Sequence, residues 1–336
     1  EWTYDSVPDF RNAVEFDPQL FFQTLLSTAK IAIEKSNINK KNIIGISSTS
    51  IREGVVFIDS RGKELYCGPQ FDGRAYLEGT VLESTMGSDI YQITGTYPPA
   101  YGYLARLLWF KKHFPEKYKR ISMVLDIGGW LTYKLTGNYY AEPSLASASG
   151  AFSIADHFWS EKLIFSQGLQ NFKFPEIKTA GKFAGGLQSD CSRIIGLSSG
   201  TPVYIGGGDS QCALLGMGCI KDGDIGIVAG TTTPIMQVLD QLIIDNNNKR
   251  TWSNCFLVDS KWCLESSAIV TGLSYRWLRD CFFSDSNYSD MESMMSNSIP
   301  GSNGIMAFLG SEIMDMKNYN SQWQGGFLFD VPPASL

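Results

Sequence analysis

Residues 204–233 read YIGGGDSQCALLGMGCIKDGDIGIVAGTTT, and the fold prediction starts from this stretch. An apolar strand over residues 202–205 runs into three glycines and Asp209, and a helix ending in small residues follows. A second strand, expected over 225–229, opens into the turn Gly230-Thr231-Thr232-Thr233. Strand, turn, helix and strand in this order are typical of α/β proteins.

The same stretch also carries chemistry. The three glycines remove side chains where a ligand must approach the backbone. Asp209 lies at a strand-to-helix turn, where a carboxylate is well placed to accept a proton, although an aspartate there can also be an ordinary helix N-cap. The turn at 230–233 offers backbone N–H groups and hydroxyls to phosphate oxygens. Taken together, these features indicate transfer of a phosphoryl group to an alcohol.

Strand-like and helical segments alternate along the rest of the chain, which favours an α/β class over a sandwich or a bundle. With 336 residues, 43% of them hydrophobic, the chain is long enough for two domains, and we place the domain change after the Asp209 helix. The other expected elements are a helix opened by Asp17-Pro18, a buried strand over 43–46, a hairpin over 55–58 and 65–67, a helix from Asp72 through Leu82, and helices over 103–113, over 130–135 and around Met291.

Composition excludes several classes of function. A formal charge of −6 argues against a nucleic-acid partner, because phosphate binding needs a basic surface. Seven scattered cysteines without a C-x-x-C pair fit a reducing cytoplasm, and no apolar run approaches a membrane span. We therefore expect a cytoplasmic protein with no membrane partner. The basic cluster is interpreted as a solvated helix face, and its members are Lys111, Lys112, Lys117, Lys119 and Arg120.

Two short motifs each have a functional and a structural interpretation. Arg52 and Glu53 precede Gly54 between two strands, where the guanidinium can donate to vicinal hydroxyls and the carboxylate can accept from them. The alternative is a surface ion pair in a turn. Asp72 and Arg74 are adjacent to the start of a helix, and for them a structural cap or ion pair is the stronger interpretation.

Two motif matches are set aside. The run 196–200 fits the G-x-S-x-G of serine hydrolases around Ser198, but that family needs a histidine after the serine, and both His113 and His157 precede it. We expect a turn there. The Asp-x-Gly beginning at Asp126 looks like an actin-type phosphate loop, but the sequence after it predicts a helix ended by Gly137 rather than a hairpin.

Several motifs follow one another along nearly the whole chain. These are Glu15-Phe16-Asp17-Pro18, the segment 48–59, Phe71 to Ala75, Trp130 to Gly137, the segments 206–218 and 230–233, and Ile299-Pro300-Gly301-Ser302-Asn303-Gly304. In this order they resemble the motifs of the FGGY family of carbohydrate kinases, which includes xylulokinases, glycerol kinases and autoinducer-2 kinases.

The resemblance implies an α/β fold of two actin-like (ribonuclease H-like) domains with a cleft between them. The chain would cover an incomplete version of each, a sugar-binding domain over 1–218 and a nucleotide-binding domain over 219–336. The family's first phosphate loop, D-x-G-T, belongs before residue 1, and its adenine-binding segment belongs beyond Leu336. A non-catalytic sugar-binding or regulatory remnant is therefore the alternative to an active kinase.

The resemblance also implies roles for individual residues. Asp209 would be the general base and would contact the substrate together with Arg52, Glu53 and Tyr101. The expected cofactors are ATP and Mg²⁺, with the magnesium ligands left open, and the partner is a small sugar or polyol that the sequence does not identify. Oligomeric state is open, with a homodimer among the options. The residues expected to bind the cofactor are Gly208, Gly230, Thr231, Thr232 and Thr233.

Overall fold

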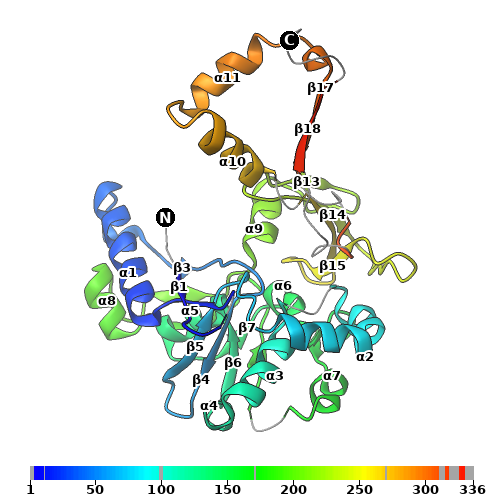
Figure 1. Cartoon of the computed structure of the whole chain (residues 1–336). Coiled ribbons are helices and arrows are strands. Elements are labelled where there is room, and N and C mark those ends of the chain that lie inside the picture. Colours follow the sequence, from blue (N-terminus) through cyan, green and yellow to red (C-terminus); the bar gives the residue numbers. More distant parts are fainter. Residues whose placement is uncertain are drawn as a thin grey trace.

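The computed structural model describes residues 4–10, 12–97, 101–169, 172–268, 271–309, 315–317 and 325–329. It is a mixed α/β structure in which helices cover several small sheets (Figure 1). In the described ranges, no helix combines the length and the apolar character needed to cross a bilayer.

We call the chain before α9 (Asp209–Gly216), up to residue 208, the first half, and the chain from Asp209 onward the second half. The centre of the first half is a sheet of order β5-β4-β6, in which β4 (Val55–Ile58) lies antiparallel to β5 (Glu64–Gly68) and β6 (Met123–Asp126). All four residues of β4 are buried, since its side chains alternate between two apolar cores. Val55 and Phe57 pack with α2 (Tyr76–Thr94) and α3 (Tyr103–His113). Val56 and Ile58 pack with α1 (Pro18–Lys35) and α5 (Ile127–Thr136). The predicted hairpin is confirmed.

The helices of this half begin and end where the sequence gives capping signals. Asp17 accepts hydrogen bonds from the N–H groups of Gln19 and Leu20 at the start of α1, and Gly137 ends α5 with φ of +85°. Helix α3 has the predicted bounds. Asp72 caps no helix, because α2 begins at Tyr76 after Ala75, and it continues to Thr94, well past the predicted end.

A second sheet brings distant parts of the chain together. Strand β12 (Pro202–Tyr204) pairs in parallel with β3 (Ile46–Ser47) and antiparallel with β11 (Phe183–Gly186). The buried strand expected over 43–46 is wrong in its bounds: regular pairing starts at Ile46, and Ile44 is 83% exposed. Beyond β12 and β3 a bridge between Ser50 and Gly208 places the loop after β3 beside the glycines that precede Asp209.

The second half begins with α9 (Asp209–Gly216), which starts at the predicted residue. Its sheet has the order β13-β14-β16-β15, with β13 (Ile225–Ile227) shorter than predicted, β14 (Thr233–Leu239), β15 (Trp252–Cys255) and β16 (Trp262–Ala268). Leu214 of α9 packs against this sheet with Met236, Val238 and Phe256. Helices α10 (Gly272–Phe282) and α11 (Tyr288–Ser296) follow, then β17 (Ile305–Leu309) paired with β18 (Gly325–Phe329).

Strand β15 and the turn before it contact the first half directly. The Ser253 N–H donates to the Gly95 carbonyl (2.9 Å), and the Tyr91 hydroxyl donates to the Thr251 carbonyl (2.7 Å). Cys255 belongs to the same apolar core as β4, α2 and α3. The two halves are therefore joined along β15, while α9 connects them through the chain itself.

The remaining described elements are shorter. They are β1 (Asp5–Ser6), β2 (Val14–Glu15), η1 (Lys40–Asn42), α4 (Pro115–Lys119), β7 (Tyr140–Ala141), α6 (Pro143–Ala146), η3 (Ser147–Ser149), β8 (Phe152–Ser153), β9 (Phe158–Trp159), α7 (Glu161–Ser166), β10 (Glu176–Ile177), α8 (Ser189–Ile195) and η4 (Ser302–Gly304).

Candidate active site

A cavity of about 210 Å³ lies where loops of the first half meet strands β14, β15 and β16 of the second. The sequence-predicted residues that line it are Arg52, Glu53, Tyr101, Asp209 and Thr232. They come from four separate parts of the chain, and only the fold brings them together. Other lining residues are Gln70, Phe71, Ser210, Trp252, Glu265 and Ser267.

Asp209 is the first residue of α9, and its side chain is exposed to solvent at the cavity. Its backbone N–H donates to the Ser50 carbonyl (2.9 Å), and its Oδ1 accepts from the N–H (2.7 Å) and hydroxyl (3.2 Å) of Ser210. The N-cap is Gly208, so the alternative that Asp209 is a capping residue is wrong. Among the described residues no donor reaches Oδ2, which leaves one carboxylate oxygen for a ligand.

The three glycines before Asp209 pack closely against protein atoms. A Cβ on Gly206 would lie 1.7 Å from the Ser48 carbonyl oxygen, and one on Gly207 would lie 2.2 Å from a methyl of Leu257. Gly208 is buried, and its N–H already donates to the Ser144 hydroxyl (2.9 Å). Gly206 lets the segment after β12 lie against the loop after β3, and the Asp209 N–H donates to the Ser50 carbonyl of that loop.

Arg52 spans the cavity between the two halves. Its two terminal nitrogens donate to the two carboxylate oxygens of Glu265 on β16, at 2.5 and 2.9 Å. Asn254 Nδ2 donates to the same carboxylate at 3.3 Å. Burial by itself would lower the pKa of Arg52, but Glu265 stabilises the charged form, and the pKa is raised overall. The alternative of a surface ion pair between Arg52 and Glu53 is not found among the described contacts. Arg52 pairs instead with Glu265, which lies 213 positions further along the chain.

Glu53 has a left-handed backbone conformation, with φ of +57°. Its carboxyl group lines the cavity, and burial raises its pKa to about 7 against the lowering effect of Arg52. A carboxyl group poised near neutrality can accept or donate a hydrogen bond. Tyr101 lines the same cavity just before α3, and burial raises its pKa as well.

The turn at 230–233 lies at the edge of the cavity. Gly230, Thr231 and Thr232 are exposed, and Thr232 lines the cavity with Asp209. The turn packs tightly on the start of α10, where a Cβ on Gly272 would lie 2.2 Å from the Gly230 carbonyl oxygen. Thr233 has a different setting, since it begins β14 and its hydroxyl bonds to that of Thr271 (2.7 Å). Gly230 and Thr231 also line a second depression of about 260 Å³ beside α10.

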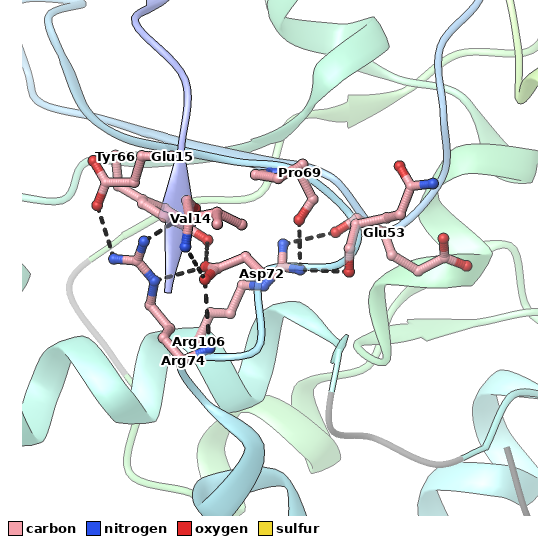
Figure 2. Close-up of polar contacts among 9 residues, drawn as sticks. Val14, Glu15, Glu53, Tyr66, Pro69, Asp72, Arg74 and Arg106 are labelled. Carbon is pink, nitrogen blue, oxygen red and sulfur yellow. Dashed lines mark hydrogen bonds and ion pairs between the residues drawn. The ribbon is translucent and has the colours of Figure 1, made fainter. Parts of the chain in front are cut away.

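Asp72 and Arg74 form the structural pair that their sequence suggested. Arg74 Nε donates to Asp72 (2.6 Å), and its other nitrogens reach Glu15 (2.8 Å) and the Val14 carbonyl (3.2 Å), as Figure 2 shows. The Tyr66 hydroxyl also donates to Asp72. This network ties β2 to the start of α2. Two other structural interpretations hold: Gly196 and Gly200 have φ of +80° and +83° in a turn, and Asp126 caps α5.

Glu265 is the site residue that sequence analysis missed. Its strand alternates half-buried and buried positions as far as Ser267, and Cys263, Glu265 and Ser267 all occupy buried ones. A glutamate in the buried register of a strand is a signal in itself, because a buried carboxylate needs a partner. Which partner it takes is not a local property of the sequence.

Comparison with known proteins identifies the family. The model of the N-terminal domain of the FGGY family of carbohydrate kinases matches residues 5–216. The chain belongs to the FGGY family of carbohydrate kinases. YoaC of Bacillus subtilis (strain 168), which is named as a sugar kinase, is 32% identical over 319 residues, covering 94% of this chain and 63% of YoaC. An autoinducer-2 kinase of Salmonella typhimurium (strain LT2) is 30% identical over 334 residues, covering 95% of this chain and 62% of that kinase.

Solved structures of FGGY kinases share the fold of two actin-like domains. Ligand-bound xylulose kinase from Lactobacillus acidophilus has a TM-score of 0.84 at 19% identity, covering 97% of this chain and 66% of that one. Plasmodium falciparum glycerol kinase with ADP has a TM-score of 0.81 at 20% identity, and the match covers 98% of this chain and 68% of that kinase. The chain thus spans about two thirds of the length of these FGGY kinases, and slightly less of the curated relatives.

Proposed function

We propose that the full-length protein transfers the γ-phosphoryl group of ATP to a hydroxyl of a small sugar, ketose or polyol. The observation that carries the proposal is the shared cavity: Asp209, Arg52, Glu53 and Thr232 line one space between the two halves. Membership of the FGGY family supports the same reaction class.

In this proposal Asp209 is the general base. Its Oδ2, which accepts no hydrogen bond from the described residues, takes the proton of the substrate hydroxyl while the hydroxyl oxygen attacks the γ-phosphorus and ADP leaves. A positioned base of this kind typically raises the reaction rate about 10²–10⁴-fold. Its other oxygen is held by Ser210, which fixes the carboxylate orientation. Glu53 accepts from substrate hydroxyls, and Arg52 donates to them with the N–H groups that Glu265 does not use. Tyr101 provides an aromatic wall.

The nucleotide would supply the phosphoryl group, and the turn at 230–232 fits its phosphates. The turn is exposed at the mouth of the cavity, and it presents two threonine hydroxyls and backbone N–H groups. The Gly230 N–H already donates within the turn to the Thr232 carbonyl (3.0 Å), so the threonines are the better contacts. No group of three acidic or other metal-binding side chains occurs in the described ranges, which fits Mg²⁺ held mainly by phosphates and water.

We also propose that the domain boundary lies near 218 and 219, after α9, and that the protein is cytoplasmic. Helix α9 packs on the second-half sheet through Leu214 while its first turn contacts the first half at Ser50. The seven cysteines are all free and scattered between buried and exposed sites, which supports a reducing compartment.

The test is sugar-dependent ADP release by the full-length protein, with glycerol, xylulose, gluconate and autoinducer-2 as the first substrate panel. Asp209→Asn should lower turnover about 10²–10⁴-fold while leaving the thermal unfolding temperature unchanged. Asp285→Asn, an exposed aspartate outside the cavity, is the matched control and should behave as wild type. Wild-type protein that binds a sugar calorimetrically yet releases no ADP would identify a binding protein instead of a kinase.

A further inference from the structure

Arg106 of α3 is fully buried and has an unusual set of partners. One terminal nitrogen donates to the Glu53 carbonyl (2.8 Å), and the other donates to the carbonyls of Pro69 (2.9 Å) and Gln70 (3.1 Å). Figure 2 shows these bonds from α3 to two separate loops. None of the described carboxylates forms an ion pair with it. A buried charge costs free energy unless it is paired with an opposite charge. The Arg106 guanidinium binds three carbonyl oxygens instead, so we ask what these three bonds hold in place.

Both loops that Arg106 holds line the cavity. Arg52 and Glu53 stand on one of them, and Gln70 and Phe71 stand on the other. The two loops follow β3 and β5, and Arg106 is the cross-link between them in the described hydrogen bonds. Its charge-assisted bonds are stronger than ordinary carbonyl bonds, so they hold the loop backbones in a fixed relation.

The loop at Glu53 needs this support. Its φ of +57° is unfavourable for a residue with a Cβ. The turn is closed by the Gly54 N–H, which donates to the Arg52 carbonyl at 2.7 Å. The bond from Arg106 to the Glu53 carbonyl holds the peptide in this orientation, and on the same loop the Arg52 side chain reaches Glu265 while Glu53 lines the cavity.

We propose that Arg106 is a positioning residue for substrate binding: it sets the orientation of Arg52 and Glu53 through their backbone without touching the substrate. The proposal rests on the proposed function in that the cavity binds a sugar or polyol. It does not require that phosphoryl transfer occur, because positioning acts on binding.

The experiment compares Arg106→Met and Arg106→Lys with Arg74→Met in the full-length protein. Arg74 is a matched control, because it is also buried but pairs with Asp72 and Glu15, which do not line the cavity. For the panel sugar with the highest affinity, we measure Kd by calorimetry, KM for sugar and for ATP, and the unfolding temperature. Arg106→Met should raise the sugar Kd and KM about 10- to 100-fold with the ATP KM unchanged. Arg106→Lys should restore part of the affinity, and Arg74→Met should lower stability alone.

Wild-type sugar affinity in Arg106→Met would overturn the proposal, and so would an equal loss of affinity in Arg74→Met at equal loss of stability. If Arg106→Met does not fold, Arg106→Lys decides: a severalfold rise in Kd supports the proposal, and no change refutes it. Calorimetry separates this outcome from failure of the proposed function, because a wild-type protein without turnover still gives a sugar Kd for the comparison.

Discussion

The ion pair of Arg52 with Glu265 joins a cavity residue of the first half to a cavity residue of the second half. Both side chains are nearly buried, with 10% and 2% of their surface exposed, so each depends on the other for neutralisation. Buried pairs add little net stability over an apolar pair of similar shape, yet removing one partner is costly. The value of this pair lies in orientation, since the bidentate contact fixes the guanidinium plane at the cavity.

Glu265→Gln should therefore lower the free energy of unfolding by roughly 3 kcal/mol and raise the sugar KM, because it leaves Arg52 charged and unneutralised. The measurement is urea unfolding together with steady-state kinetics. Glu116→Gln breaks an exposed pair with Lys119, 82% and 65% exposed, and should cost less than about 1 kcal/mol. Equal effects of the two substitutions would show that Arg52 is adequately solvated without Glu265.

Asp126 should make stability depend on pH. It is 2% exposed, its Oδ1 accepts the Gly129 N–H (2.6 Å), and its buried Oδ2 has no hydrogen-bond partner among the residues that the structure describes. Burial raises its pKa to about 6 from an unfolded value near 4, so the protonated form is favoured in the folded state. Its contribution to stability is therefore full below the unfolded pKa and is lost as pH rises through about 6.

Asp126→Asn keeps a good N-cap for α5 and removes the titration. Its stability relative to wild type should improve between about pH 4 and pH 7, by up to roughly 3 kcal/mol. Urea midpoints of both proteins across this range measure the difference. A difference that is flat with pH, or that runs in the opposite direction, would mean that the carboxyl is ionised in the folded protein at all these pH values.

At the scale of elements, helix α1 depends on its cap more than the buried helices do. It has 18 residues, and only Phe22 and Leu26 are fully buried. Asp17→Ala should lower the free energy of unfolding by about 1 kcal/mol, since two N–H groups lose their acceptor. Asp17→Asn is the matched control and should be nearly neutral in the same thermal unfolding measurement. An alanine variant as stable as wild type would show that packing alone holds α1.

Elements with local signals were predictable from sequence, and those set by tertiary contact were not. The cap at Asp17, the stop at Gly137 and the alternation around β4 each lie within a few residues, so α1, α5 and the hairpin were found. The strand over 43–46 failed because apolar character there does not lead to burial: Ile44 is exposed. The motifs gave the positions that line the cavity, but the partners of Arg52 and the loop contacts of Arg106 depend on packing between elements far apart in the chain.

At the scale of the whole molecule, the two halves contact each other along β15, along β16 and through the segment before β15, and Arg52 and Glu265 join them at the cavity. The indole N–H groups of Trp252 and Trp262 donate to the Tyr97 carbonyl (2.5 Å) and the Ile154 carbonyl (3.0 Å) of the first half. Leu242 and Ile244 pack on the first-half core. Helices α10 and α11 and strands β17 and β18 lie at the far end, away from this contact (Figure 1). A shared core of this kind predicts cooperative unfolding of the halves.

Gly95 allows a direct test of that coupling. It ends α2 with φ of +71°, and a Cβ there would lie 2.4 Å from the Ser253 carbonyl oxygen of β15. Gly137 ends α5 with φ of +85°, but the nearest atom to its Cβ would be 3.5 Å away. Gly137→Ala should therefore show only the backbone cost, about 1 kcal/mol, whereas Gly95→Ala should also push β15 away from α2.

We expect Gly95→Ala to split the calorimetric unfolding transition into two and to raise the sugar KM, because residues of both halves line the cavity and must keep their relative positions. Gly137→Ala should shift a single transition and leave KM unchanged. If both variants give one transition with the same shift, β15 tolerates displacement and the halves are coupled elsewhere, with α9 and the Arg52–Glu265 pair among the other connections. Because Asp209 is the first residue of α9 and its N–H donates to the Ser50 carbonyl, α9 would then be one of the elements that keep the proposed general base at the cavity.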